Sequence, residues 1–212
     1  MEKMIIEKLK LHKQWIESLG QAGEQLVLDE FNLSDIDLSN HDFSNSILTE
    51  VNFSNALLND VTFFGCNLAS SCFDNALLHR ALFNKAEADY ASFKNADMQE
   101  VSAFKASFPF TDLSDANLSK VNFSRTILNQ ANLLQANLSN ANLTDATLEG
   151  AILNGVNLEN AILTGCRLYN TEMKGIIGIE SIIAEWIDVG PATQPHKLTG
   201  DDVLSWIKSR IT

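Results

Sequence analysis

The strongest constraint in this sequence is a five-residue period that runs from Leu28 to Met173 without one insertion. Every fifth residue is a centre, and 28 of the 30 centres are Leu, Phe or Met; the exceptions are Ala88 and Ala103. In most repeats a small residue stands two places before the centre, and it is Ala in 14 of 30 cases; the first three of these positions are the large residues Leu26, Phe31 and Ile36. A period kept this strictly describes repeated structural units rather than low-complexity filler.

A period of five fits neither an amphipathic α-helix nor a flat β-strand. On a helix, successive centres would be rotated by about 140° and would spread over every side. A chain that turns a corner every five residues instead keeps all centres pointing inward. The small residue also points inward, because side chains alternate along extended backbone. Asn, Asp, Ser and Thr are frequent beside the centres and favour tight turns, so they supply the corners.

The unbroken pattern A(N/D)(L/F)xx, as in QANLLQANLSNANLTDA at 130–146, resembles the pentapeptide-repeat family over about 150 of the 212 residues. The resemblance implies an all-β solenoid, a right-handed quadrilateral parallel β-helix with four pentapeptides per coil. Thirty pentapeptides would make about 7.5 coils. Residues 20 apart should then stack, and the early phenylalanines fall into two opposed columns: Phe53, Phe73 and Phe93 in one, and Phe43, Phe63 and Phe83 in the other.

We expect three segments: an N-terminal capping helix in residues 1–25, the repeat β-helix in 26–175 and a C-terminal helical cap in 176–212. An open β-stack needs covered ends, because exposed edges invite aggregation. Residues 2–19 predict an amphipathic helix that stops at Gly20. Its expected apolar stripe is Ile5, Leu9, Ile16 and Leu19.

After Gly175 the five-residue frame dissolves, and we expect a short helix or an irregular cap around Trp186. The run TGDD at 199–202 predicts a capping-box-like start of a final helix. The apolar residues of that helix are Val203, Leu204, Ile207 and Ile211. The terminal helices either cap the rod or pair two chains, so the protein is a monomer or a homodimer through a terminal cap; we favour capping.

Catalysis is not expected, and neither is a cofactor or a metal site. The four histidines are scattered without metal-ligand spacing, and the chain has no Gly-rich phosphate loop and no GxSxG motif. The alternative of an enzyme that uses the C-terminal segment rests only on an unassigned neighbourhood of Trp186, Asp188 and His196. Cys66 and Cys166 occupy inward small positions and should be buried, whereas Cys72 faces outward and is either structural or reactive.

Composition limits the partners. No apolar run approaches the ~18 residues of a membrane span, and the N-terminus lacks the pattern of a secretory signal, so a cytoplasmic protein that avoids membranes is expected. With 27 acidic and 15 basic residues, the net charge is −12, which disfavours direct nucleic-acid binding. A partner protein with a basic surface is compatible with this charge.

The first coils contain most of the unbalanced acid. Residues 26–60 contain seven carboxylates and no Lys or Arg. Six of them form our candidate acidic patch: Asp29, Glu30, Asp35, Asp37, Asp42 and Glu50. Some relatives in the resembled family imitate DNA in the DNA-binding saddle of type II topoisomerases and confer quinolone resistance or toxin immunity. The whole repeat has about half the charge density of B-DNA, so the acids either imitate DNA or only keep the rod soluble.

Four aromatic residues form a second candidate surface, because their positions point outward near the two undersized centres Ala88 and Ala103. They are Phe64, Tyr90, Phe104 and Phe110. Either these rings fold back to fill the core, or they form an apolar contact patch. The sequence as a whole predicts a non-catalytic rod that binds a protein partner of unknown identity. The alternative is a DNA-mimicking modulator of DNA gyrase or another type II topoisomerase.

Overall fold

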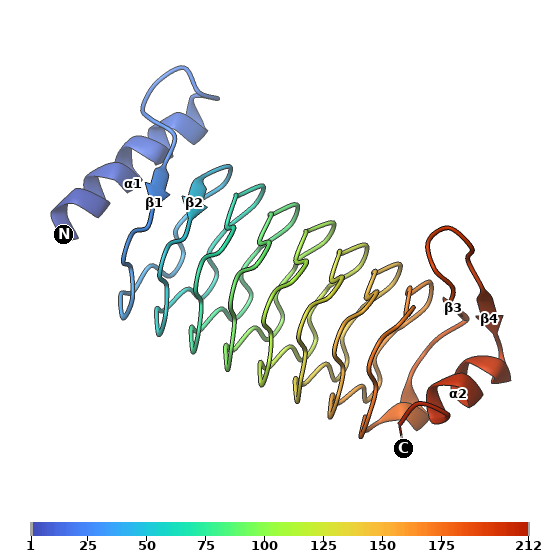
Figure 1. Cartoon of the computed structure of the whole chain (residues 1–212). Coiled ribbons are helices and arrows are strands. Elements are labelled where there is room, and N and C mark those ends of the chain that lie inside the picture. Colours follow the sequence, from blue (N-terminus) through green and yellow to red (C-terminus); the bar gives the residue numbers. More distant parts are fainter. Residues whose placement is uncertain (1, 212) are drawn as a thin grey trace.

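The computed structural model describes residues 2–211 as a rod of stacked coils with a helix near each end (Figure 1). Parallel β-bridges join residues 20 apart from Asn32–Asn52 as far as Asn157–Ile177, so each coil contains 20 residues. Strands β1 (Val27–Asp29) and β2 (Ile47–Thr49) pair in the same register. The chain is therefore a parallel β-helix solenoid, and hydrogen bonds along the rod join each coil to the next.

The corners of the coil are made by a residue in the left-handed backbone region, two places after each centre. At Asn55, for example, φ is 58°, and the N–H of Ala56 donates to the carbonyl of Phe53 over 3.0 Å. A positive φ at the third turn residue alone is the geometry of a type II turn. Asn, Asp and Gly tolerate this conformation best, and they fill 17 of these 30 positions.

The Asn that precedes many centres stabilises the corner from its side chain. The Oδ1 atom of Asn52 accepts hydrogen bonds from the backbone N–H and the hydroxyl of Ser54, over 2.9 and 2.6 Å. Asn132 does the same for the N–H of Leu134. These bonds satisfy turn N–H groups that the coil-to-coil ladder does not reach.

The core is a ladder of aromatic rings, as the 20-residue register predicts. Ring centroids of Phe73 and Phe93 lie 4.6 Å apart and those of Phe53 and Phe73 lie 4.8 Å apart, both stacked. Phe63 belongs to the opposed column and meets Phe73 edge-on at 5.7 Å. All these rings are fully buried. The two predicted phenylalanine columns are confirmed, and edge-to-face contacts join them.

The ring of Phe108 fills the space next to the undersized centres. Phe108 stands one coil after Ala88 in the same column, and it lies 5.7 to 6.1 Å from the rings of Phe83, Phe93 and Phe123. It thereby bridges the interruption that Ala103 leaves between Phe83 and Phe123. The outward aromatic residues therefore do not need to fold back into the core.

The N-terminal helix α1 (Glu2–Glu17) packs its Ile5 and Leu9 against the first coil. The expectation that Leu19 lies on the buried stripe is wrong, because this residue lies beyond the end of the helix with a φ of 55° and is 90% exposed. The stripe includes the buried His12 instead. The Nδ1 atom of His12 accepts the N–H of Leu26 over 3.0 Å, and its Nε2 atom lies 3.0 Å from the hydroxyl of Ser46.

The C-terminal segment keeps the path of the coil beyond Gly175. A turn of 3-10 helix, η1 (Ile179–Ser181), adds one residue, so that the next bridges join Ile162 with Ile183 and Arg167 with Asp188. Trp186 lies in strand β3 (Trp186–Asp188) rather than in a helix, and β3 pairs antiparallel with β4 (Lys197–Thr199).

Helix α2 (Asp201–Lys208) buries Val203 and Ile207 against the end of the rod. The expected capping box is wrong, because Gly200 is the N-cap and no side chain caps the helix. Asp201 and Asp202 instead place negative charge in the first turn, where it interacts favourably with the positive end of the helix dipole.

Candidate functional site on the outer corners

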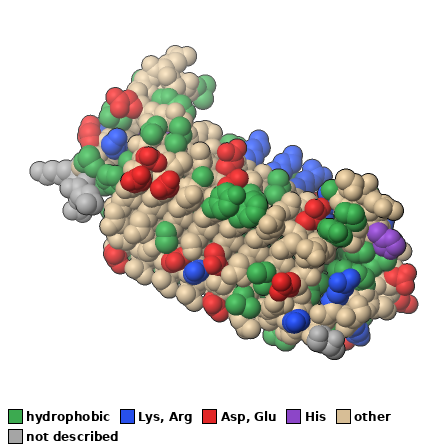
Figure 2. Space-filling model, in the orientation of Figure 1, with side chains coloured by type: hydrophobic (Ala, Val, Ile, Leu, Met, Phe, Trp, Pro, Cys, Tyr) green, Lys and Arg blue, Asp and Glu red, His purple; other side chains and the backbone are tan. Residues whose placement is uncertain are grey.

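The six acidic residues of the first coils are all exposed. Within residues 2–211, none of them forms an ion pair. On the face turned to the viewer in Figure 2, acidic side chains gather over the N-terminal coils, and a compact hydrophobic patch lies near the middle of the rod. The N-terminal part of the rod therefore presents uncompensated negative charge.

The structure does not bring these six residues together on one side. Asp29, Glu30 and Glu50 share a corner that we name the Glu50 corner, which continues through Ser70, Tyr90, Phe110 and Gln130. Asp35 lies at the next corner, whereas Asp37 and Asp42 lie on two later sides of the coil. A hydrogen bond from the Ser39 N–H lowers the pKa of Asp37 and favours its charged form. The six carboxylates are therefore distributed around the perimeter of the first coils.

Farther along the rod, several carboxylates are paired with a base of the same chain. The guanidinium of Arg80 contacts Asp60 through two hydrogen bonds of 2.7 and 2.6 Å, and Lys120 contacts Glu100 over 3.0 Å. These four residues stack one coil apart, and we name them the Arg80 corner. The Arg80 guanidinium lowers the pKa of Asp60. Adjacent coils thus place a base and an acid at hydrogen-bonding distance when the sequence supplies them.

The four outward aromatic residues divide between two corners. Phe64 and Phe104 lie at a basic corner with Lys85 and Lys105, which we name the Lys85 corner. The Lys85 Nζ atom lies 5.3 Å from the centre of the Phe64 ring, and the Lys105 Nζ atom lies 5.1 Å from that of Phe104. Each of these rings therefore already has a cation from its own chain.

Tyr90 and Phe110 belong to the Glu50 corner, where no Lys or Arg among the described residues lies over either ring. Their rings are parallel within 4° and their centroids are 4.8 Å apart. Tyr90 is 62% exposed and Phe110 is 43% exposed. Both residues have positive φ angles, 60° and 57°, a conformation that bulky side chains rarely adopt. This pair is an exposed aromatic step at a strained corner, and the five-residue frame already separates it from Phe64 and Phe104, which follow their centres directly instead of by two places.

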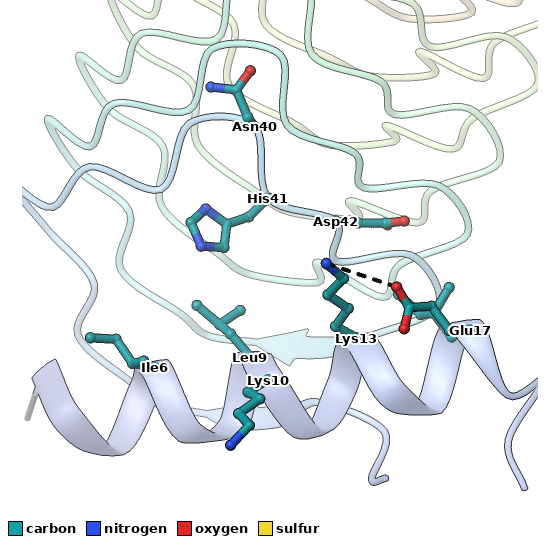
Figure 3. Close-up of a pocket in the computed structure, with 9 residues that line it drawn as sticks. Ile6, Leu9, Lys10, Lys13, Glu17, Asn40, His41 and Asp42 are labelled. Carbon is teal, nitrogen blue, oxygen red and sulfur yellow. Dashed lines mark ion pairs between the residues drawn. The ribbon is translucent and has the colours of Figure 1, made fainter. Parts of the chain in front are cut away.

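A groove of about 580 Å³ lies between helix α1 and the turn at residues 40–42 (Figure 3). The helix contributes Ile6, Leu9 and Lys13, and the turn contributes His41 and Asp42. Lys13 lies 3.8 Å from Glu17 across one helical turn. The groove is open, and the polar side chains that line it among residues 2–211 are all exposed, so it gives less evidence of a specific ligand than the corners do.

Asp188, one of the three residues considered for catalysis, has a structural role. Asp188 is buried, and its Oδ1 atom accepts the backbone N–H groups of Gly190 and His196 over 3.0 and 2.8 Å. This carboxylate therefore holds the loop between β3 and β4. Across residues 2–211, no group of three His, Cys, Asp or Glu side chains is arranged to hold a metal ion. The helices of that same range are all too short or too polar to cross a membrane.

The cysteines follow the expectation from their positions. Cys66 and Cys166 are buried, and their thiols donate to the carbonyls of Phe43 and Leu143 over 2.8 and 2.9 Å. Burial raises the pKa of Cys66 to about 12 and also raises the pKa of Cys166. Cys72 is half-buried, with its sulfur 3.1 Å from the Ser54 hydroxyl.

Two solved structures align with most of this chain. A trypsin-treated variant of QnrB1, a plasmid-mediated fluoroquinolone resistance protein, aligns with a TM-score of 0.68 at 16% identity. The alignment covers 88% of this chain and 97% of QnrB1. HetL, a pentapeptide repeat protein involved in heterocyst differentiation regulation in the cyanobacterium Nostoc sp. strain PCC 7120, aligns at 21% identity with a TM-score of 0.46. The latter alignment covers 87% of this chain and 97% of HetL.

Sequence models identify the family directly. No curated protein matches the chain. The model for pentapeptide repeats (8 copies) matches residues 28–63 and 62–99, and the model for a pentapeptide repeat region matches residues 101–176. Together these matches cover 148 of the 212 residues. The chain belongs to the pentapeptide-repeat family.

Proposed function

We propose that this protein is a non-catalytic, cytoplasmic rod that binds a protein partner through side chains on its outer corners. The main support for the proposal is that corners with the same backbone geometry differ in their exposed side chains. Charges at the Arg80 corner neutralise each other, whereas the Glu50 corner leaves carboxylates unpaired and two aromatic rings exposed. Exposed rings beside unpaired charges favour a protein partner over a purely solubilising role.

The rod of this proposal is a right-handed quadrilateral β-helix of about 7.5 coils with a helical cap at each end. Four left-handed residues in every 20-residue coil support the four-cornered shape. The buried faces of α1 and α2 support the caps. The net charge of −12 supports a partner with a basic surface and opposes direct nucleic-acid binding.

Photocrosslinking in the cell that makes the protein tests this function. Gln130, Gln135, Asn140 and Asp145 are consecutive exposed corners of a single coil, so a photoreactive residue at each samples the four corners at equal depth. The proposal predicts a discrete protein adduct from one or two adjacent corners and none from the opposite corners. Absence of any adduct from all four corners, with the proteins folded, would remove the proposal.

The second candidate function is DNA mimicry towards a type II topoisomerase. It is favoured by the six exposed and unpaired carboxylates of the first coils. QnrB1 is a fluoroquinolone resistance protein, but at 16% identity the likeness supports the shared fold alone. The acids encircle the coils instead of forming two rows on one side, which is why this function ranks second.

A DNA supercoiling assay with purified gyrase separates the two functions. The protein is titrated to micromolar concentration with and without a quinolone. DNA mimicry predicts inhibition or protection that weakens when Glu30, Asp35 and Asp42 are each replaced by Lys, and that becomes less sensitive to salt. No effect of the unmodified protein on either reaction would eliminate the second candidate.

A further inference from the structure

At the Arg80 and Lys85 corners, a cation of the chain itself contacts the exposed carboxylates or rings, whereas the Glu50 corner has no such cation among the described residues. Consecutive positions along it are Glu50, Ser70 and Tyr90, and backbone hydrogen bonds of 3.0 Å from Glu50 to Ala69 and of 2.9 Å from Ser70 to Asp89 join the neighbouring coils. The centroid spacing of 4.8 Å between Tyr90 and Phe110 gives the distance between adjacent positions. Glu50 and Tyr90 are therefore two coils apart, with the short side chain of Ser70 between them.

One face of the Tyr90 ring is free. Phe110 stacks on the face that points along the rod towards the C-terminal end, so the opposite face is directed towards Ser70. The larger exposure of Tyr90, 62% against 43% for Phe110, agrees with this. Ser70 is also exposed, and its hydroxyl makes no hydrogen bond among the described residues. A planar group at the level of Ser70 would contact the tyrosine ring on one side and the Glu50 carboxylate on the other.

The Arg80 corner shows which group suits this place. There Arg80, at the position equivalent to Ser70 in its own corner, contacts Asp60 of the preceding coil through two hydrogen bonds. A guanidinium at the level of one coil is thus within reach of a carboxylate on the coil before it. A guanidinium also stacks on aromatic rings and is more weakly hydrated than an ammonium group. Ser70 leaves both the carboxylate and the ring without such a group.

We propose that the Glu50 corner is an arginine-binding site for the partner protein. The guanidinium of a partner arginine lies over Ser70, stacks on the free face of Tyr90 and pairs with the carboxylate of Glu50. Phe110 supports the tyrosine ring from behind. Glu30 continues the negative charge one coil farther and favours a second basic residue in the same partner segment. This site rests on the proposed function and names the chemistry of its partner.

The test uses the full-length protein and two capped octapeptides, one alternating Gly with Arg and the other Gly with Lys. Binding is measured by calorimetry at two salt concentrations. We expect the arginine peptide to bind more tightly than the lysine peptide. Tyr90→Asn should weaken arginine-peptide binding about fivefold, since an exposed cation–π contact contributes about 1 kcal/mol. Asn is favoured at positive φ, so this variant keeps its corner.

Two further variants examine the site without touching the rings. Ser70→Arg places a guanidinium of the chain itself between Tyr90 and Glu50 and should abolish the preference for arginine over lysine. Ser70→Asn leaves the space largely open and should retain that preference. The paired change Phe64→Ser and Phe104→Ser removes two exposed rings at the Lys85 corner and is the matched control, with binding expected within twofold of the unmodified protein.

The proposed site would be overturned if the unmodified protein, Tyr90→Asn and Ser70→Arg all bound the arginine peptide equally well. That result would indicate diffuse attraction of the peptide by negative charge. The same conclusion follows if the Phe64 and Phe104 control loses as much binding as Tyr90→Asn. Neither result affects the photocrosslinking pattern, so an adduct from one corner would preserve the rod function while this site was discarded.

Discussion

The backbone N–H of Leu26 donates a hydrogen bond of 3.0 Å to Nδ1 of His12, and this bond ties helix α1 to the first residue of the first coil. Because Nδ1 accepts, the neutral imidazole has its proton on Nε2, where it faces the Ser46 hydroxyl at 3.0 Å. The ring also stacks on Trp15. Helix α1 is thus held on the first coil by a histidine that must remain neutral.

This arrangement predicts that the packing of helix α1 on the first coil becomes less stable as the pH falls. Burial lowers the pKa of His12, against a smaller opposing influence from Asp42. The unfolded chain therefore binds the proton more readily, so the contribution of His12 is complete above about pH 6.5 and is lost as the pH falls from there through the lowered folded pKa. The slope is at most about 1.4 kcal/mol per pH unit. Urea unfolding at pH 7.5 and 5.5 measures it.

The control for this prediction is His12→Gln, which retains a side-chain hydrogen-bonding group without a titration near neutral pH. It should be less stable than the unmodified protein at pH 7.5 and should lose less stability on acidification. Equal losses in both proteins would show that other groups, and not His12, produce the pH dependence.

Removal of the Phe108 ring should destabilise the protein strongly, whereas removal of the Phe110 ring should not. Phe108→Ala leaves a cavity among Phe83, Phe93 and Phe123 and should cost about 3–5 kcal/mol. Phe110→Asn removes an exposed ring and relieves a strained backbone, so it should change stability by less than about 0.5 kcal/mol or increase it. Denaturant unfolding compares the two. Similar losses from both would mean that the Phe110 ring is part of the core packing.

The cysteines should differ in reactivity towards a thiol reagent at pH 8. Cys66 and Cys166 are buried, and the pKa of Cys66 is about 12, so neither forms thiolate in the folded rod. At most one thiol, that of Cys72, should react in the native protein, and three should react in urea. A native count above one would indicate that the coils open around Cys66 or Cys166.

Asp188→Ala should loosen the C-terminal hairpin. The substitution leaves the N–H groups of Gly190 and His196 without their acceptor, at a cost of about 1–3 kcal/mol. Hydrogen exchange at those two amides should accelerate, while the amide of Leu133 in the middle of the rod should not change. Asp202→Ala, at an exposed position in α2, is the control and should leave the exchange at both amides unchanged.

The sequence predicts the repeat well because every centre must be an apolar side chain that points into the core. The stacking of Phe73 on Phe93 and the burial of Cys66 follow from the register alone. The sequence could not predict that the ring of Phe108 fills the space beside the undersized centres. That packing depends on how the rings of Phe83, Phe93 and Phe123 are oriented in three dimensions. The caps were less predictable: Leu19 and Trp186 are apolar residues outside the repeat, where no periodic restraint fixes which side is buried.

The candidate surfaces were only partly visible in the sequence. Exposure of Tyr90 and Phe110 follows from the frame, but Lys85 and Lys105 satisfy the rings of Phe64 and Phe104 in a way that only the corner geometry reveals. Likewise, the sequence groups the six acids by proximity along the chain, whereas the coil distributes them around its perimeter.

The most direct test of the account follows one photocrosslinked adduct, that of a photoreactive residue at Gln130, the next position of the Glu50 corner after Phe110. The adduct is quantified in the otherwise unmodified protein, in Tyr90→Asn with Phe110→Asn, and in the Phe64→Ser with Phe104→Ser control. The account predicts at least a fivefold loss in the first variant and no loss in the control. An adduct that persists in the first variant, or equal adducts from all four corners, would contradict it.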